Sequence, residues 1–118
     1  MDGLLAKKQK GTRQIQWSHA TNSTGELEHA LQSGVDMIEA DVMLSLESDA
    51  IIMCHPPHTT SDLTLAQFLT RVAAANSQGL LVGIKLDFKD PAAVPLALAV
   101  LQAMPALQEG TRPLALPH

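Results

Sequence analysis

The sequence predicts an α/β fold in which parallel strands alternate with helices, as in part of a TIM-like (βα) barrel. Apolar runs of strand length alternate with amphipathic segments that begin at capping residues and end near glycine or proline. Polar residues also follow the carboxyl ends of several strands, which is where α/β barrels place their active sites. A closed barrel needs roughly 200 residues or more. The 118 residues here therefore correspond to about the first half of one.

Composition indicates one globular domain without a basic surface. Hydrophobic residues make up 46% of the chain and charged residues 17%, which suits a folded core. The formal net charge of -4 argues against nucleic acid as a partner. No segment has the pattern of a signal peptide or the length of a transmembrane span. With Cys54 as the one cysteine, these features favour a reducing, cytoplasmic location.

We expect three parts along the chain: a flexible lead-in over residues 1–13, an incomplete barrel domain over 14–108 and an irregular, proline-containing tail over 109–118. Within the domain, a short strand is predicted over 14–18. Ser23 and Glu26 have the spacing of a capping box, which predicts the start of a helix that ends near Gly34.

Further elements follow this first βα unit. They are a strand over 35–42, a hairpin over 44–53 with a polar turn at 47–49, a helix from a Thr64–Gln67 capping box to about Ala75, a strand over 80–88, and a helix from Asp90 and Pro91 to Pro105. This alternation of strands and helices implies parallel βα units.

Glu39 and Asp41 lie inside an apolar strand at positions i and i+2. That spacing places both carboxylates on one face of the strand. Two adjacent carboxylates in a hydrophobic strand are costly unless positive charge compensates them. Mg²⁺ or Ca²⁺ would compensate them, because both ions prefer oxygen ligands. Taken alone, this stretch leaves two interpretations open: a cation site, or an ordinary strand with a solvated polar face.

Other strand ends carry residues with compatible chemistry. Asp87 supplies a third carboxylate for the same cation, and Lys89 supplies positive charge for an anionic group. His19 and His55 are suited to act as general acid and base near neutral pH. The full set suits metal-assisted phosphodiester chemistry and consists of His19, Asn22, Glu39, Asp41, His55, Asp87 and Lys89, with Lys85 on the same strand face as Asp87.

Each of these residues also has an ordinary interpretation. A histidine after a strand is often a turn or capping residue, and Lys85 and Lys89 are compatible with strand-end charges that extend to water. Asp90 is assigned to a helix cap. Cys54 is assigned to packing, because nothing nearby marks its thiol as activated. The functional interpretation rests on the coincidence of compatible groups at independent strand ends.

Five segments together resemble the menorin family. They are WSHATN at 17–22, IEADV at 38–42, MCHPP at 53–57, SDLTL at 61–65 and GIKLDFK at 83–89. That family is similar to phospholipase-C-like phosphodiesterase barrels, which include glycerophosphodiester phosphodiesterases and sphingomyelinase D. In the sphingomyelinase D branch a His-x-x-Asn follows the first strand, a Glu-x-Asp the second, a second His comes shortly after, and an Asp-x-Lys ends the third.

The resemblance implies roles for the matching residues. It implies His19 and His55 as an acid/base pair, and it implies Mg²⁺ (or Ca²⁺) ligands at Glu39, Asp41 and Asp87. On the same basis, Asn22, Lys85 and Lys89 are expected to bind the substrate, a phosphodiester or phospholipid-type small molecule. The His-Arg-Gly of the glycerophosphodiesterase branch is replaced by His19-Ala20-Thr21, which leaves the substrate open.

Family members continue through further βα units, so we expect this chain to be a truncated or alternatively spliced member that is inactive alone. The alternative is a non-enzymatic binding or scaffold protein on a degenerate barrel, since sites and not folds decide function. A third interpretation is an isoform without a stable fold. By family resemblance, an extracellular location is the alternative to the cytoplasm.

Overall fold

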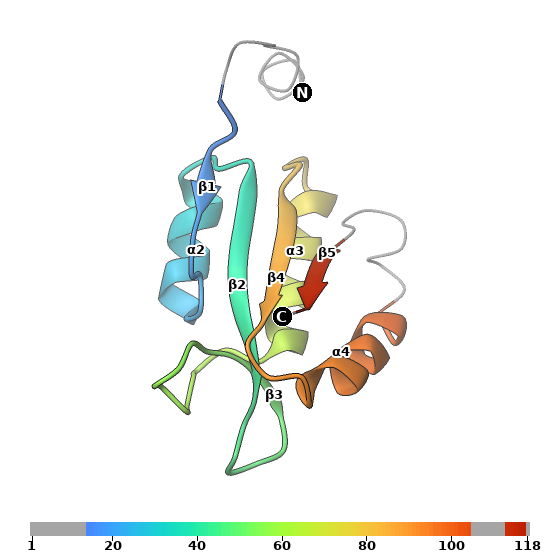
Figure 1. Cartoon of the computed structure of the whole chain (residues 1–118). Helices are drawn as coiled ribbons and strands as arrows, with labels where there is room; N and C mark the ends of the chain where they lie inside the picture. The colour runs from blue at the N-terminus through green and yellow to red at the C-terminus, as the bar shows by residue number, and fades with distance from the viewer. Residues whose placement is uncertain (1–13, 105–112, 118) are drawn as a thin grey trace.

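Strands and helices alternate along the part of the chain that the computed structural model describes, residues 14–104 and 113–117 (Figure 1). In chain order the elements are β1 (Trp17–Ser18), α2 (Thr24–Gln32), β2 (Met37–Leu44), β3 (Ile51–Met53), α3 (Leu65–Ser77), β4 (Gly83–Phe88), α4 (Ala93–Gln102) and β5 (Pro113–Pro117). The main path of the sheet is β1-β2-β4-β5, and each pair on this path is parallel. β3 pairs with β2 in antiparallel orientation, as a hairpin requires.

Capping side chains explain where two of the helices begin. α3 starts at the predicted capping box, in which Thr64 and Gln67 accept hydrogen bonds from each other's backbone N–H groups. α2 starts at Ser23, whose hydroxyl accepts from the Glu26 N–H group. The Glu26 carboxylate, however, accepts from the N–H group of Asn22 and not from that of Ser23. The predicted box at Ser23 is therefore right in one of its two bonds.

α4 begins later than the sequence predicts. Its first residue is Ala93, and Asp90 holds the preceding turn. The Asp90 carboxylate accepts from the Ala92 N–H group at 3.0 Å, and the Asp90 carbonyl accepts from the Ala93 N–H group at 3.0 Å. Asp90 therefore stabilises the turn that leads into α4. In the described part of the chain, neither α4 nor any other helix combines the length and the apolar character that crossing a bilayer requires.

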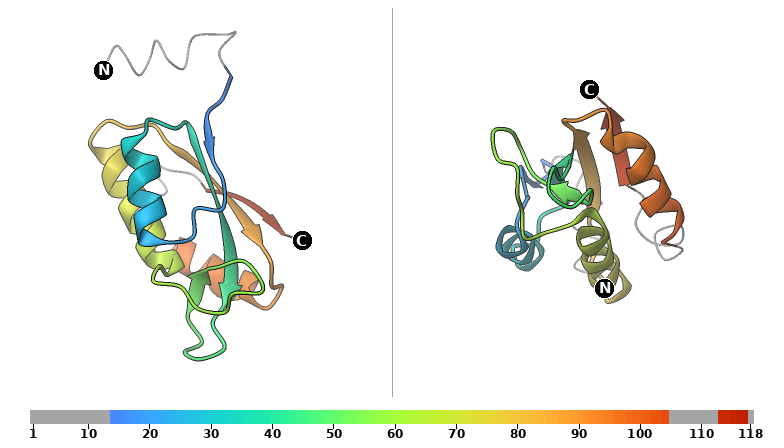
Figure 2. Two further views of the ribbon diagram at one scale, coloured as in Figure 1. Left: turned by 90° about the vertical axis from the view of Figure 1, so that its left-hand side faces the viewer. Right: turned by 90° about the horizontal axis from the view of Figure 1, so that it is seen from below.

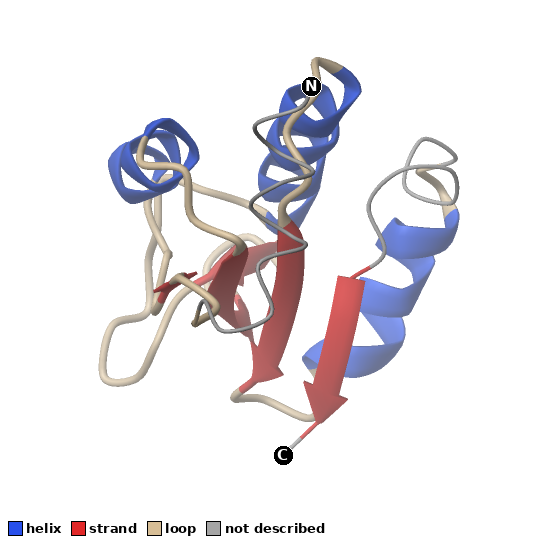
Figure 3. Cartoon of the chain, turned by 90° about the horizontal axis from the view of Figure 1, so that it is seen from above, coloured by secondary structure: helices blue, strands red, loops and turns tan. Residues whose placement is uncertain are grey.

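The two faces of the β2–β4 pair are covered differently. Helices α2 and α3 lie along one side of the sheet (Figures 2 and 3). The strand side chains that pack in the common core with residues of these helices are Ile38, Ala40, Val42, Ile84, Leu86 and Phe88, all buried. Because side chains alternate along a strand, Glu39, Asp41, Lys85 and Asp87 belong to the opposite face. Among the described residues, no helix covers that face.

The prediction of an irregular tail is wrong for residues 113–117. These residues form β5, which runs parallel to β4 with Pro113 opposite Ile84 and Pro117 opposite Phe88. Prolines are tolerated here because β5 ends the path of the sheet, where a strand bonds along one edge only. The predicted lead-in, residues 1–13, and the rest of the tail lie outside the described residues.

Candidate functional site

Three carboxylates converge on the face of the sheet that lies opposite α2 and α3. Glu39 and Asp41 are two residues apart on β2, and Asp87 of β4 is paired in register with Asp41. One oxygen from each carboxylate lies within 4.8 Å of the other two. Oxygen ligands of a single Mg²⁺ or Ca²⁺ are separated by at most about 4 to 5 Å. The three residues therefore fit one hard cation with small side-chain adjustments.

Lys89 supplies positive charge to this cluster. Its Nζ lies 2.8 Å from Asp87 Oδ2 and 3.9 Å from Asp41 Oδ1. The hydrogen bond to Asp87, with the attraction of Asp41 and Glu39, raises the pKa of Lys89. The Lys89 N–H group also donates to the Val42 carbonyl at 3.1 Å, which extends the β2–β4 pairing past the end of β4. The ammonium group is thus held at the carboxyl end of the strand, beside the acids.

The segment after β1 fixes Glu39. The Ala20 N–H group donates to Glu39 Oε1 at 2.7 Å, and the Thr21 N–H group donates to the Glu39 carbonyl at 2.9 Å. Ala20 has a φ of 52°. This left-handed conformation costs roughly 1–2 kcal/mol for a residue other than glycine. The hydrogen bonds to Glu39 offset that cost, so the turn at Ala20 is part of what orients this carboxylate.

Asn22 fixes Asp41. Asn22 Nδ2 donates to Asp41 Oδ2 at 2.9 Å, and the Asp41 N–H group donates to Asn22 Oδ1 at 2.9 Å. The Asp41 side chain is 3% exposed, so a charged group is buried here with identified partners. The sequence predicted Asn22 as a substrate-binding residue, whereas in the structure its amide faces a carboxylate of the cluster.

His19 directly precedes a residue that contacts the acidic cluster, but its ring stacks on Trp17. It directly precedes Ala20, and its exposed imidazole stacks on Trp17 with ring centroids 5.6 Å apart and planes inclined by 11°. Lys85, which pairs with Glu39 across β2 and β4, has its Nζ 6.0 Å from the Trp17 ring centroid. Trp17 was not predicted as a site residue, and its position two residues before His19 was the only available signal.

His55 is attached to the cluster through its neighbour. The Cys54 N–H group donates to the Asp41 carbonyl at 2.9 Å, which places the next residue beside the part of β2 that carries the acids. The His55 side chain is exposed, and its Nδ1 contacts the Pro56 carbonyl. The backbone thus brings both predicted histidines beside the acidic cluster. In the described structure their rings contact Trp17 and Pro56.

Cys54 itself has the properties of a packing residue. It is 2% exposed, and burial raises the pKa of its thiol. Its Sγ lies 3.5 Å from the Thr60 carbonyl oxygen. A buried thiol with a raised pKa is a poor nucleophile, so the assignment made from the sequence is supported.

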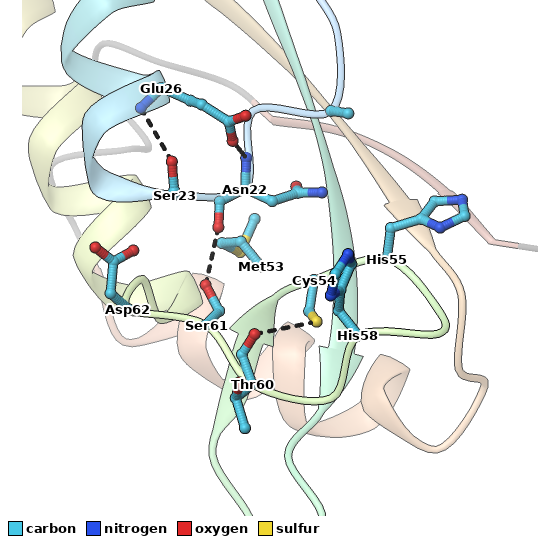
Figure 4. A pocket seen from close by; sticks show the side chains of 11 residues that line it. Asn22, Ser23, Glu26, Met53, Cys54, His55, His58, Thr60, Ser61 and Asp62 are labelled. Atoms are coloured by element: carbon cyan, nitrogen blue, oxygen red, sulfur yellow. Dashed lines mark hydrogen bonds between the residues drawn. The ribbon is translucent and has the colours of Figure 1, made fainter.

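A cavity of about 370 Å³ lies between the start of α2 and the loop over 54–64 (Figure 4). Its lining includes two predicted residues, Asn22 and His55, and two that were not predicted, Ser61 and Asp62. Ser61 Oγ donates to the Asn22 carbonyl at 2.8 Å, and the Thr24 N–H group donates to Asp62 Oδ1 at 2.9 Å. These partners are 39 and 38 residues apart in the chain. No local sequence pattern links residues at such a separation.

Asp36 is a buried acid that serves the fold and not the site. It is 1% exposed and lies at the amino end of β2. Its carboxylate accepts from the Gln16 N–H group at 2.8 Å, and its carbonyl accepts from the Gly83 N–H group at 3.0 Å. Asp36 therefore joins the starts of β1, β2 and β4, at the opposite end of the strands from Asp87.

Comparisons with known proteins give a consistent family. Residues 11–117 match the family described as the Menorin N-terminal domain. The human protein FAM151B is 44% identical over 92 residues, which cover 75% of this chain and 32% of FAM151B. The chain therefore spans about a third of the length of this curated relative. No solved structure matches the chain. Because the family match covers nearly the whole sequence, the chain belongs to the menorin family.

Proposed function

We propose that this chain provides the divalent-cation site of a metal-dependent phosphodiesterase-like protein. The observation that supports the proposal is the convergence of Glu39, Asp41 and Asp87 within 4.8 Å on a face that no described helix covers. An all-oxygen donor set with a carboxylate from each of two paired strands suits Mg²⁺ or Ca²⁺. A cation bound there would neutralise a phosphate and stabilise the negative charge that develops during phosphoryl transfer.

Other residues of the chain supply the remaining functions in this proposal. Lys89 and Lys85 present ammonium groups on the face that carries the acids and would attract the anionic phosphate. His19 and His55 are exposed beside the cluster, so a substrate can reach both rings. One histidine would accept a proton from the nucleophile and the other would protonate the leaving oxygen. The proposed substrates are phospholipid-type or glycerophosphodiester molecules.

The proposal includes the architecture that surrounds the site. We infer that β1, β2, β4 and β5 form about the first half of a parallel (βα) barrel whose interior faces the acidic cluster. The parallel pairing, the helices along one side and the position of Asp87 and Lys89 at the end of β4 support this inference. FAM151B is about three times as long as the matched region, which leaves length for further βα units in such relatives.

Calorimetric titration of the 118-residue chain with Mg²⁺ tests the cation site. We expect saturable binding of one ion. Asp41→Asn should weaken it at least tenfold, because even groups that only hydrogen-bond a metal ligand change affinity by about 10–100-fold. Asp49→Asn is the matched control, since Asp49 is exposed in the β2–β3 turn and its φ of 59° is one that asparagine accepts readily. An absence of saturable binding, or an equal loss in both variants, would refute the site.

A second candidate function is cation-dependent binding without turnover. The observation that favours it is that both imidazoles are engaged with neighbouring residues, His19 with Trp17 and His55 with Pro56. The two candidate functions predict different results for a full-length menorin-family protein, tested unaltered and with alanine at the position equivalent to His19. If the family is enzymatic, hydrolysis of a glycerophosphodiester should stop while Mg²⁺ affinity stays unchanged. If unaltered full-length protein binds Mg²⁺ and the phosphodiester without hydrolysing it, the binding function is correct.

A further inference from the structure

Asn22 connects more parts of the candidate site than any role in substrate binding explains. It makes four hydrogen bonds through both its backbone and its side chain. Its N–H group donates to Glu26 Oε1 at 3.0 Å and its carbonyl accepts from Ser61 Oγ at 2.8 Å (Figure 4). Its side-chain amide makes the two bonds to Asp41. Asn22 thus joins the start of α2, the loop over 54–64 and β2.

The two bonds to Asp41 restrict the carboxylate and the backbone of that residue together. Asn22 Oδ1 accepts from the Asp41 N–H group while Asn22 Nδ2 donates to Asp41 Oδ2, each at 2.9 Å. Rotation of the carboxylate about χ1 would break the second bond while the first remained. Because Asp41 Oδ2 is used in this way, Asp41 Oδ1 is the oxygen that lies nearer to Lys89 Nζ. The Asp41 carboxylate is therefore presented to the cluster in one orientation.

The loop that carries His55 is bonded to this same pair of residues at two points. Near its start, the Cys54 N–H group donates to the Asp41 carbonyl at 2.9 Å. Near its end, Ser61 Oγ donates to the Asn22 carbonyl at 2.8 Å. A change in the position of Asn22 relative to Asp41 would therefore also shift the loop.

We propose that Asn22 is a positioning residue, which orients the Asp41 carboxylate and couples the loop over 54–64 to it. This role replaces the substrate contact expected from the sequence. As far as it concerns metal binding, the inference rests on the cation site proposed above. Groups that hydrogen-bond a metal ligand typically change metal affinity by about 10–100-fold when they are removed.

Asn76 provides a matched control within the same chain. Its side-chain amide also binds one residue twice, with Nδ2 donating to the Val82 carbonyl at 3.0 Å and the Val82 N–H group donating to Oδ1 at 2.9 Å. Asn76 is half-buried, as Asn22 is. It lies in the last turn of α3 and binds Val82 just before β4, at the opposite end of β4 from Asp87. Asn76→Ala thus removes an equivalent pair of bonds without touching the cluster.

The first measurement is amide hydrogen exchange in metal-free protein, which does not depend on the cation site. In Asn22→Ala we expect faster exchange at the amides of Asp41 and Cys54, and in Asn76→Ala at the amide of Val82 only. Unchanged exchange at Asp41 in Asn22→Ala, or the same increase in both variants, would overturn the inference.

The second measurement is the Mg²⁺ dissociation constant of the same variants. Asn22→Ala should weaken binding by about 10-fold or more, Ser61→Ala by less, and Asn76→Ala by less than about twofold. Asn22→Ala with unchanged Mg²⁺ affinity would overturn the positioning role. If the unaltered chain binds no Mg²⁺, the proposed cation site fails, and the exchange data alone then decide whether Asn22 orients Asp41.

Discussion

The same two strands carry an apolar face and a charged face, and the two faces are stabilised in different ways. Toward the helices, Ile38 and Ile84 sit opposite each other, each with 0% exposure. On the other face, Asp41 and Asp87 sit opposite each other, with Lys89 between them. Burial of the first pair stabilises the fold, because it removes apolar surface from water. The two carboxylates of the second pair repel each other. They are stabilised by Lys89, by Asn22 and, in our proposal, by a cation.

This difference separates stability from function within one sheet. Substitutions on the apolar face should change the free energy of unfolding and leave cation binding of the folded protein intact. Substitutions on the charged face should change cation binding more than they change the free energy of unfolding. Of the four predictions below, in order of decreasing effect, the first three test this separation and the fourth tests an ion pair that lies on neither face.

Neighbouring residues of β4 give the largest expected contrast. Ile84→Ala should lower the free energy of unfolding by about 2–5 kcal/mol, because it removes buried methyl and methylene groups and leaves a cavity. Lys85→Ala, one residue along and on the other face, should change it by about 0.5 kcal/mol or less. Urea unfolding followed by circular dichroism measures both values. Equal losses would show that the charged face contributes to the core.

Mg²⁺ should stabilise the chain by an amount set by mass action. At a free concentration of 100 times its Kd, the ion should add about 2.7 kcal/mol to the free energy of unfolding. At the same Mg²⁺ concentration, Glu39→Gln should reduce this gain to about 1.4 kcal/mol or less, the value for a tenfold or greater loss of affinity. The substitution removes one negative charge and leaves an oxygen that can accept from the Ala20 N–H group. Thermal melts with and without Mg²⁺ measure the effect. A full gain in the variant would remove Glu39 from the ligand set.

Deprotonation of Lys89 should make the metal-free protein less stable at alkaline pH. Its pKa in the folded state is raised above the ordinary 10.5 by the bond to Asp87. The stabilisation is therefore complete below pH 10.5 and is lost as the pH rises through the raised value. Melts of metal-free protein across this range should show the loss, and Lys89→Met should not. The same loss in Lys89→Met would assign the effect to other groups.

The ion pair between α2 and α3 should have the smallest effect. Arg71 Nε lies 2.6 Å from Glu28 Oε2, and both side chains are more than a third exposed. The hydrogen bond from Arg71 lowers the pKa of Glu28, so its contribution is present above pH 4.5 and is lost as the pH falls through the lowered value. Glu28→Gln should lower the free energy of unfolding by at most about 1 kcal/mol. Added salt should reduce that difference, and a larger one that resists salt would contradict the assignment.

Local features of the fold were predictable because their causes are local. The Thr64–Gln67 capping box and the polar turn between β2 and β3 depend on residues a few positions apart. The alternation in β2 and β4 also predicted that Glu39 and Asp41 share a face, which the register with Asp87 then completes. The sequence did not predict β5, because its prolines indicate an irregular tail. The strand depends on pairing along the edge of β4, which only the fold shows.

The residues that orient the site could not be read from the sequence. The family resemblance implied a substrate-binding role for Asn22, and only the fold places it against Asp41, 19 residues along the chain. Ser61 and Asp62 reach the start of α2 over still longer separations. Trp17 resembled an ordinary strand residue until its stacking on His19 was visible. Sequence periodicity assigns a side chain to a face but does not identify its partner.

The two strands at the ends of the sheet path affect how this chain meets other chains. β1 has two residues, and β5 begins and ends with proline. A strand that short offers little template for a foreign strand, and the two prolines remove N–H donors that an added strand would need. Natural sheet proteins use both features to prevent edge-to-edge aggregation. The described sheet is therefore a weak template for fibril growth at either end, although in our proposal a further strand of the barrel still pairs with β5.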